Sequence, residues 1–171
     1  HLSIRRQRQM CIRDRIESVG IKLDVVDERF QGTEIDVAFH GQLTSTQMSA
    51  VNEIMRFDDG VLVAPSGSGK TVMGIYMIAA RRRNTLVLVH RQPLLEQWRA
   101  QLASFLEVDP KTIGQIGGGK EKQTGFIDIA MLQSLIRKNQ VDDIVAGYGQ
   151  VIVDECHHLP AVTFEQVLRQ V

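Results

Sequence analysis

The chain has few cysteines, few aromatic residues and no long apolar run. Its 171 residues include two cysteines, Cys11 and Cys156, and 5% aromatic residues. Two cysteines cannot build the disulfide framework of a small secreted domain, so the composition favours a reducing, cytoplasmic setting. No apolar stretch approaches the roughly 18 residues that a membrane-spanning helix needs. The length and the 43% hydrophobic content predict one globular domain with a core of its own.

The sequence also lacks an excess of either charge, because 20 basic residues balance 20 acidic ones. Five arginines and one aspartate stand in residues 1–15, and residues 9–15 resemble the in-frame translation of a transposase end sequence used to prepare sequencing libraries. We interpret residues 1–15 as a sequencing-adapter artefact and exclude them. The remaining residues carry 15 basic and 19 acidic side chains, a net charge of −4. A nucleic-acid surface, if present, must therefore be a local stripe.

Hydrophobic periodicity predicts a small β-hairpin in residues 16–40, followed by an α/β domain in residues 41–171. Apolar and polar residues alternate at 21–25 and 35–39, as in two paired strands. Apolar spacing predicts helices that begin near Thr44, after Thr71 and at Pro93. Apolar runs predict buried strands, at residues 61–63, 85–89, 127–131 and 151–153. Buried strands separated by helices indicate a three-layer domain with a mostly parallel sheet.

A glycine-rich segment at residues 64–71 lies between a predicted strand and a predicted helix, as in a phosphate-binding loop. Glycines let backbone N–H groups and the positive helix end face phosphate oxygens. We expect Lys70 to contact the outer phosphates and Thr71 to bind magnesium. An ordinary Gly/Ser turn with a surface lysine is the alternative. The predicted nucleotide-binding residues of this loop are Ser66, Gly67, Ser68, Gly69, Lys70 and Thr71.

Two carboxylates, Asp154 and Glu155, follow the last predicted strand. Phosphoryl transfer to water needs a bound magnesium ion and an oriented water molecule. Asp154 suits the metal and Glu155 suits the water, so both join Lys70 as candidate catalytic residues; a solvated acidic pair is the alternative. Zinc is rejected at Cys156 and the two following histidines, because adjacent side chains cannot easily share one ion and no second cluster exists.

The segment Asp154-Glu155-Cys156-His157 matches the Asp-Glu-x-His box of the DExH group of superfamily 2 (DEAD/DEAH-box) helicases. The chain from about Gly41 onward resembles their first RecA-like, ATP-binding domain, of the restriction-subunit type. This resemblance implies ATP and Mg²⁺ as cofactors, adenine contact by Gln47, and a coupling role for His157 and His158. It also implies a second RecA-like domain beyond Val171, with arginine fingers that stabilise the transition state.

The same resemblance implies nucleic-acid contacts in three further segments. Residues 89–98 resemble motif Ia, residues 117–120 motif Ib and residues 132–134 motif Ic. These segments would bring charged and polar donors to the phosphate backbone: Arg91, Gly118, Gly119, Lys120, Gln133 and Ser134. Turns and loop caps are the structural alternative, and Trp98 stands at core spacing, as a packing residue does.

The resulting prediction is a helicase or translocase motor that acts on DNA in preference to RNA, with a possible nuclease or phage-defence partner. Two alternatives stay open. One is a nucleotide-gated module that clamps nucleic acid without moving, and the other is a different P-loop enzyme such as a kinase. Glu155 discriminates between motor and clamp, because a clamp that does not hydrolyse ATP has no need of this carboxylate.

Overall fold

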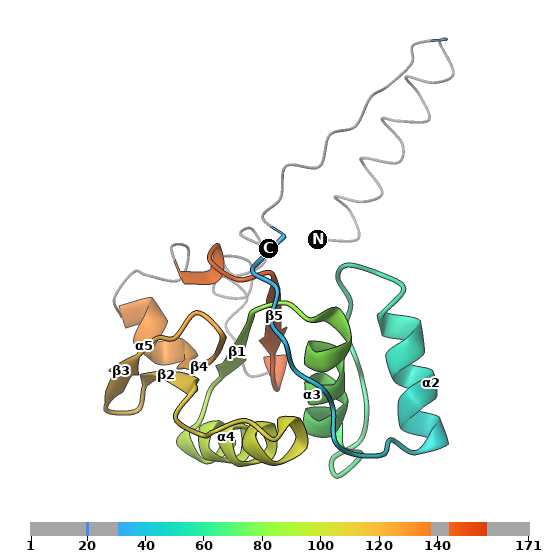
Figure 1. Cartoon of the computed structure of the whole chain (residues 1–171), viewed down its shortest axis with the longest axis horizontal. Helices are drawn as coiled ribbons and strands as arrows, with labels where there is room; N and C mark the ends of the chain where they lie inside the picture. The colour runs from blue at the N-terminus through green and yellow to red at the C-terminus, as the bar shows by residue number, and fades with distance from the viewer. Residues whose placement is uncertain (1–19, 21–30, 138–143, 157–171) are drawn as a thin grey trace.

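A computed structural model describes residue 20 and residues 31–137 and 144–156 of the chain, and in these ranges it contains a five-stranded sheet (Figure 1). The order across the sheet is β3-β2-β4-β1-β5. Neighbouring strands are parallel, except that β3 pairs antiparallel with β2. The strands are β1 (Thr85–Val89), β2 (Ile113–Gly117), β3 (Lys120–Lys122), β4 (Ile127–Met131) and β5 (Gln150–Val153). The predicted α/β class with a mostly parallel sheet is confirmed.

Helices connect these strands and cover both faces of the sheet. They are α2 (Ser45–Ile54), α3 (Lys70–Arg81), α4 (Gln92–Leu106) and α5 (Leu132–Arg137). Proline stands in the first turn of α4, where its missing N–H leaves no hydrogen bond unmade. Helix α2 lies beside α3 (Figure 1) and begins with a capping box formed by Thr44 and Gln47. The helices predicted to begin near residues 44, 71 and 93 are therefore confirmed.

The core has two layers because side chains alternate along each strand. Val87 and Val89 of β1 pack in one cluster with α3 and α4, and their neighbours Leu86 and Leu88 pack in a second cluster with α5. All four of these side chains are at most 1% exposed. Burial on both faces explains why β1 reads as an uninterrupted apolar run in the sequence.

The strand predicted at residues 61–63 is wrong. These residues form no strand, and Val61 is 69% exposed and Val63 89% exposed. A strand needs a neighbour to accept and donate its backbone hydrogen bonds, and the sheet of the described residues contains no strand beside this segment. An apolar composition cannot replace that neighbour.

The predicted hairpin is only partly covered, since its first arm lies outside the described residues. Its second arm, at residues 35–39, is not a strand. The chain before it pairs instead with the turn between α3 and β1, where Asn84 N donates to Thr33 O (2.8 Å) and Ile35 N donates to Arg82 O (3.0 Å). Ile35 and Val37 are buried in the cluster of α3 and α4. The segment therefore packs against the domain.

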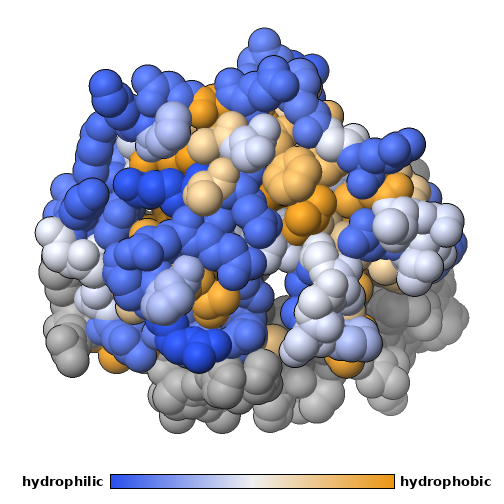
Figure 2. Space-filling model, turned by 90° about the horizontal axis from the view of Figure 1, so that it is seen from below, coloured by the Kyte–Doolittle hydropathy of each residue, from blue (hydrophilic) through white to orange (hydrophobic). Residues whose placement is uncertain are grey.

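One face of the described part combines polar and apolar areas. On the face seen from below, hydrophobic residues form patches within a mainly hydrophilic surface (Figure 2). No helix in the described ranges is both long and apolar enough to span a membrane.

Candidate nucleotide and nucleic-acid site

The predicted site residues follow parallel strands, and parallel strands end at the same edge of a sheet. Arg91 follows β1, Gln133 and Ser134 follow the end of β4, and Asp154 follows β5. Ligands of such sheets bind at this edge, outside the carboxyl ends of the strands. The fold thus gives residues far apart in the sequence one common location.

The predicted phosphate-binding loop leads directly into α3, with Gly69 as the N-cap at φ +82°. Gly67 also has a positive φ of +78°, and a side chain would be strained at both positions. Lys70 Nζ donates to the loop carbonyls Ala64 O (2.9 Å) and Pro65 O (3.0 Å). Ser68 Oγ is buried without a hydrogen-bond partner. Phosphate oxygens could take the place of the two carbonyls and accept from this hydroxyl, so the loop fits a nucleotide.

Gln47 links the start of α2 to the phosphate-binding loop. Its Oε1 accepts from Thr44 N (3.0 Å), and its Nε2 donates to Ser68 O (2.9 Å). A Cβ atom built on Gly69 would lie 2.5 Å from the same Nε2, so glycine is needed for this approach. Gln47 is therefore placed at the loop, and its contact with adenine stays a prediction.

Two neighbouring residues of α4 hold both predicted magnesium ligands. Trp98 Nε1 donates to Asp154 Oδ2 (2.8 Å), and Gln97 Nε2 donates to Thr71 Oγ1 (3.2 Å). Thr71 and Asp154 therefore both contact α4, although one lies in the first turn of a helix and the other follows a strand. A hydroxyl and a carboxylate are the oxygen ligands that Mg²⁺ prefers.

The other acidic residue, Glu155, forms an ion pair with a residue predicted to contact nucleic acid. Its Oε2 lies 3.2 Å from Arg91 Nη2 and 3.5 Å from His90 Nε2. Glu155 adopts a positive φ of 52°, which is unusual for a residue with a side chain. This ion pair joins the candidate hydrolytic residue to the candidate nucleic-acid surface.

The three segments predicted to contact nucleic acid lie side by side. A Cβ atom on Gly117 would lie 2.4 Å from Ser134 Oγ, and one on Gly118 would lie 2.2 Å from Gln92 Oε1. The β2–β3 turn therefore touches both the start of α5 and the start of α4. Gly118, Gly119, Lys120 and Gln133 are exposed there. His157 and His158 lie outside the described residues.

Sequence reasoning missed the contacts of Gln97, Trp98 and His90 with this site. Trp98 is 1% exposed, which confirms the predicted packing role, but its N–H also reaches Asp154. A buried indole N–H usually has a hydrogen-bond partner, and this rule is the signal that could have suggested a second role.

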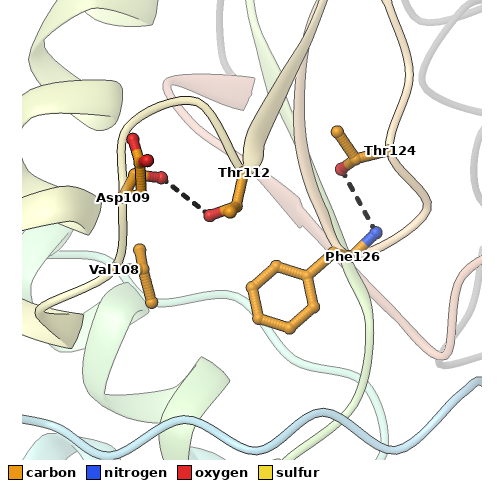
Figure 3. A pocket seen from close by; sticks show the side chains of 5 residues that line it. All are labelled: Val108, Asp109, Thr112, Thr124 and Phe126. Atoms are coloured by element: carbon orange, nitrogen blue, oxygen red, sulfur yellow. Dashed lines mark hydrogen bonds between the residues drawn. The ribbon is translucent and has the colours of Figure 1, made fainter.

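A separate hollow of about 500 Å³ lies at the opposite edge of the sheet (Figure 3). Its walls come from the segments that precede β2 and β4: Val108, Asp109, Thr112, Thr124 and Phe126. Thr112 Oγ1 donates to Asp109 O (2.7 Å), and Phe126 N donates to Thr124 Oγ1 (3.3 Å). The hollow therefore does not coincide with the candidate site, which follows the carboxyl ends of the strands.

The fold and the loop define a class, the RecA-like P-loop domain of helicases. The described fold is similar to the UvsW helicase of bacteriophage T4, with a TM-score of 0.66 and 16% identity over 94% of this chain and 64% of that one. A family model described as "Type III restriction enzyme, res subunit" matches residues 40–171. The chain belongs to this family, and the predicted resemblance to superfamily 2 helicases is confirmed.

The names of two curated relatives state an activity. The chain is 29% identical over 120 residues to "DNA 3'-5' translocase XPB2" of Sulfurisphaera tokodaii, covering 70% of this chain and 26% of the relative. It is 32% identical over 138 residues to "DNA 3'-5' helicase XPB" of Kineococcus radiotolerans, covering 76% and 24%. The chain thus spans about a quarter of these relatives.

Proposed function

We propose that this chain is the first motor domain of a DNA helicase or translocase, and that it hydrolyses Mg-ATP together with a second RecA-like domain. The names of the relatives in Sulfurisphaera tokodaii and Kineococcus radiotolerans support DNA as the substrate. The family description supports a nuclease partner, as in a restriction enzyme. Residues 41–171 would be the motor domain, and residues 16–40 an N-terminal extension.

The observation that carries this proposal is the position of Thr71 and Asp154, which contact adjacent residues of α4. Thr71 and Asp154 would hold Mg²⁺, with Asp154 acting directly or through a water molecule. The bound ion supplies charge neutralisation at the phosphates. Lys70 would bind the outer phosphates in place of the loop carbonyls. Glu155 would orient the attacking water and accept its proton.

The Arg91–Glu155 ion pair supports the nucleic-acid dependence of this activity. Arg91 and His90 lie against the Glu155 carboxylate. A DNA phosphate that binds Arg91 would compete with Glu155 for this cation, because both partners are anions. The Arg91–Glu155 ion pair would then weaken, and the Glu155 carboxylate would be more available to the water. DNA binding and hydrolysis would be coupled through one side-chain contact.

A glutamine variant of Glu155 tests the proposal in a protein that includes the second motor domain. The Glu155→Gln protein is expected to bind ATP and DNA as the unmodified protein does, and to lose about 10²- to 10⁴-fold in ATPase rate. Glu53→Gln is the matched control, because Glu53 is exposed on α2 and pairs only locally with Arg56 (3.3 Å) among the described contacts. Unchanged hydrolysis by Glu155→Gln would remove the water-activating role.

The same assay separates the motor from the clamp and DNA from RNA. An unmodified protein that binds Mg-ATP and DNA without DNA-stimulated hydrolysis would be a clamp. Stimulation by RNA in place of DNA would overturn the choice of substrate. Strand displacement or triplex disruption then measures movement directly.

A further inference from the structure

The indole of Trp98 connects the interior of the domain to a carboxylate of the candidate site. The ring is 1% exposed, and its Nε1–H donates to Asp154 Oδ2 at 2.8 Å. Asp154 itself is only partly buried. One carboxylate oxygen is therefore fixed by the interior, and Oδ1 remains to face the cation or its water.

A glycine of α3 makes room for this indole. A Cβ atom built on Gly74 would lie 2.7 Å from Cη2 of Trp98, too close for any side chain without a shift. Gly74 stands one turn after Lys70 and Thr71, on the helix that begins at the phosphate-binding loop. The indole therefore lies between the loop's helix and the end of β5, and packing fixes the direction of its N–H.

The preceding residue contacts the other candidate ligand. Gln97 Nε2 donates to Thr71 Oγ1 at 3.2 Å. This residue is exposed, and its amide contributes less rigidity than the buried indole does. Even so, two consecutive residues of α4 donate hydrogen bonds to the two groups that the proposed function assigns to magnesium.

We infer that Trp98 is a positioning residue for magnesium, which orients Asp154 through its indole N–H in a space provided by Gly74. This inference rests on the proposed function, because Asp154 must be a metal ligand for the orientation to matter. Outer partners that orient a metal ligand typically contribute about 10- to 100-fold in metal affinity. Loss of the N–H is thus expected to raise the Mg²⁺ concentration needed for nucleotide binding by about 10-fold.

The sharpest test exchanges only the N–H of Trp98, in a protein that includes the second motor domain. Site-specific incorporation of 3-benzothienylalanine at position 98 keeps the bicyclic shape and exchanges the N–H for sulfur. Binding of a fluorescent ATP analogue is measured with EDTA and across a Mg²⁺ titration. The expected result is an unchanged affinity in EDTA and a Mg²⁺ midpoint about 10-fold higher. Trp98→Phe is the genetic counterpart and is expected to shift the midpoint in the same direction.

A core variant separates orientation from packing. Leu102 is fully buried in the same cluster as Trp98, and Leu102→Ala is expected to lower thermal stability without shifting the Mg²⁺ midpoint. A second control places Trp98→Phe in an Asp154→Asn background, where no further shift is expected. The positioning role would be overturned if the two substitutions shifted the Mg²⁺ midpoint additively or if Trp98→Phe left the midpoint unchanged. It would also be overturned if nucleotide affinity fell equally in EDTA and in Mg²⁺. Absence of Mg²⁺-dependent nucleotide binding in an unmodified protein that includes the second motor domain would instead contradict the proposed function itself.

Discussion

Replacing Arg91 by alanine removes one of the side chains that contact the Glu155 carboxylate, and His90 remains beside it. The pair spans 3.2 Å, with the arginine side chain 58% exposed and the glutamate side chain 27% exposed. Water screens such a pair, so it contributes about 0.2–1 kcal/mol. A free energy of about 1.4 kcal/mol corresponds to a factor of ten in an equilibrium constant. Loss of the ion pair in Arg91→Ala therefore shifts the equilibrium away from the held position of Glu155 by a factor of about 1.4 to 5. In a protein with both motor domains, we expect the ATPase rate without DNA to rise by this factor and stimulation by DNA to fall.

The assay is steady-state ATP hydrolysis with and without DNA, at low salt and at 1 M salt. At 1 M salt the Debye length is about 3 Å, which screens the Arg91–Glu155 attraction. The unmodified protein and Arg91→Ala are therefore expected to hydrolyse ATP at similar rates without DNA. Arg82→Ala is the matched control, because Arg82 is 51% exposed and pairs with Asp36 (2.6 Å) away from the site. A fall in the DNA-free rate, or an equal rise in the control, would refute the reasoning.

Three further variants test the loop, the core and a helix cap. Lys70→Ala is expected to weaken ATP binding by about 10-fold or more in a nucleotide titration, because it removes a charged donor. Lys122→Ala, which loses only a bond to Lys111 O (3.1 Å), is the control and is expected to bind normally. Tyr148→Phe removes the hydroxyl that donates to buried Asp128, and urea unfolding is expected to show a loss of about 1–3 kcal/mol. Burial, with the Asp128 bond, raises the pKa of Tyr148, so stability from this group is complete below the unfolded pKa of about 10 and falls above it. Unfolding titrations above this pH are expected to show a shallower loss in Tyr148→Phe, and an equal slope would contradict the assignment. Thr44→Ala removes the N-cap of α2 and is expected to cost about 1 kcal/mol in thermal unfolding, whereas a neutral result would show that the capping box adds nothing.

The sequence predicted the strands that are buried on both faces. Strands β1 and β4 match the predicted ranges, and β5 begins one residue earlier. Strand β2 was missed because Gly114 and Gln115 interrupt its apolar pattern. A Cβ on Gly114 would lie 1.6 Å from Asp128 Oδ1, so glycine is required there, and Gln115 Nε2 donates to Gly117 O (3.0 Å). The requirement for Gly114 comes from a tertiary neighbour, whereas Gln115 makes its hydrogen bond within the same strand.

The candidate site was predictable by residue type but not by contact. The loop and the two carboxylates have recognisable patterns, and their roles in binding and hydrolysis remain predictions. The bond from Trp98 to Asp154 spans 56 positions, and the pair of Arg91 and Glu155 spans 64. Such contacts depend on how α4 packs between α3 and the end of β5. Local periodicity contains no information about that arrangement.

The two outermost strands of the sheet differ in chemistry. Strand β3 consists of Lys120, Glu121 and Lys122, all exposed, and such charge discourages pairing with another chain. Among the described residues, β5 is the outermost strand on the other side, with partly buried Val151 and Ile152. Self-association of a purified sample through the β3 edge of the sheet is therefore disfavoured. Dilute samples monitored by light scattering are the appropriate form for every titration described above.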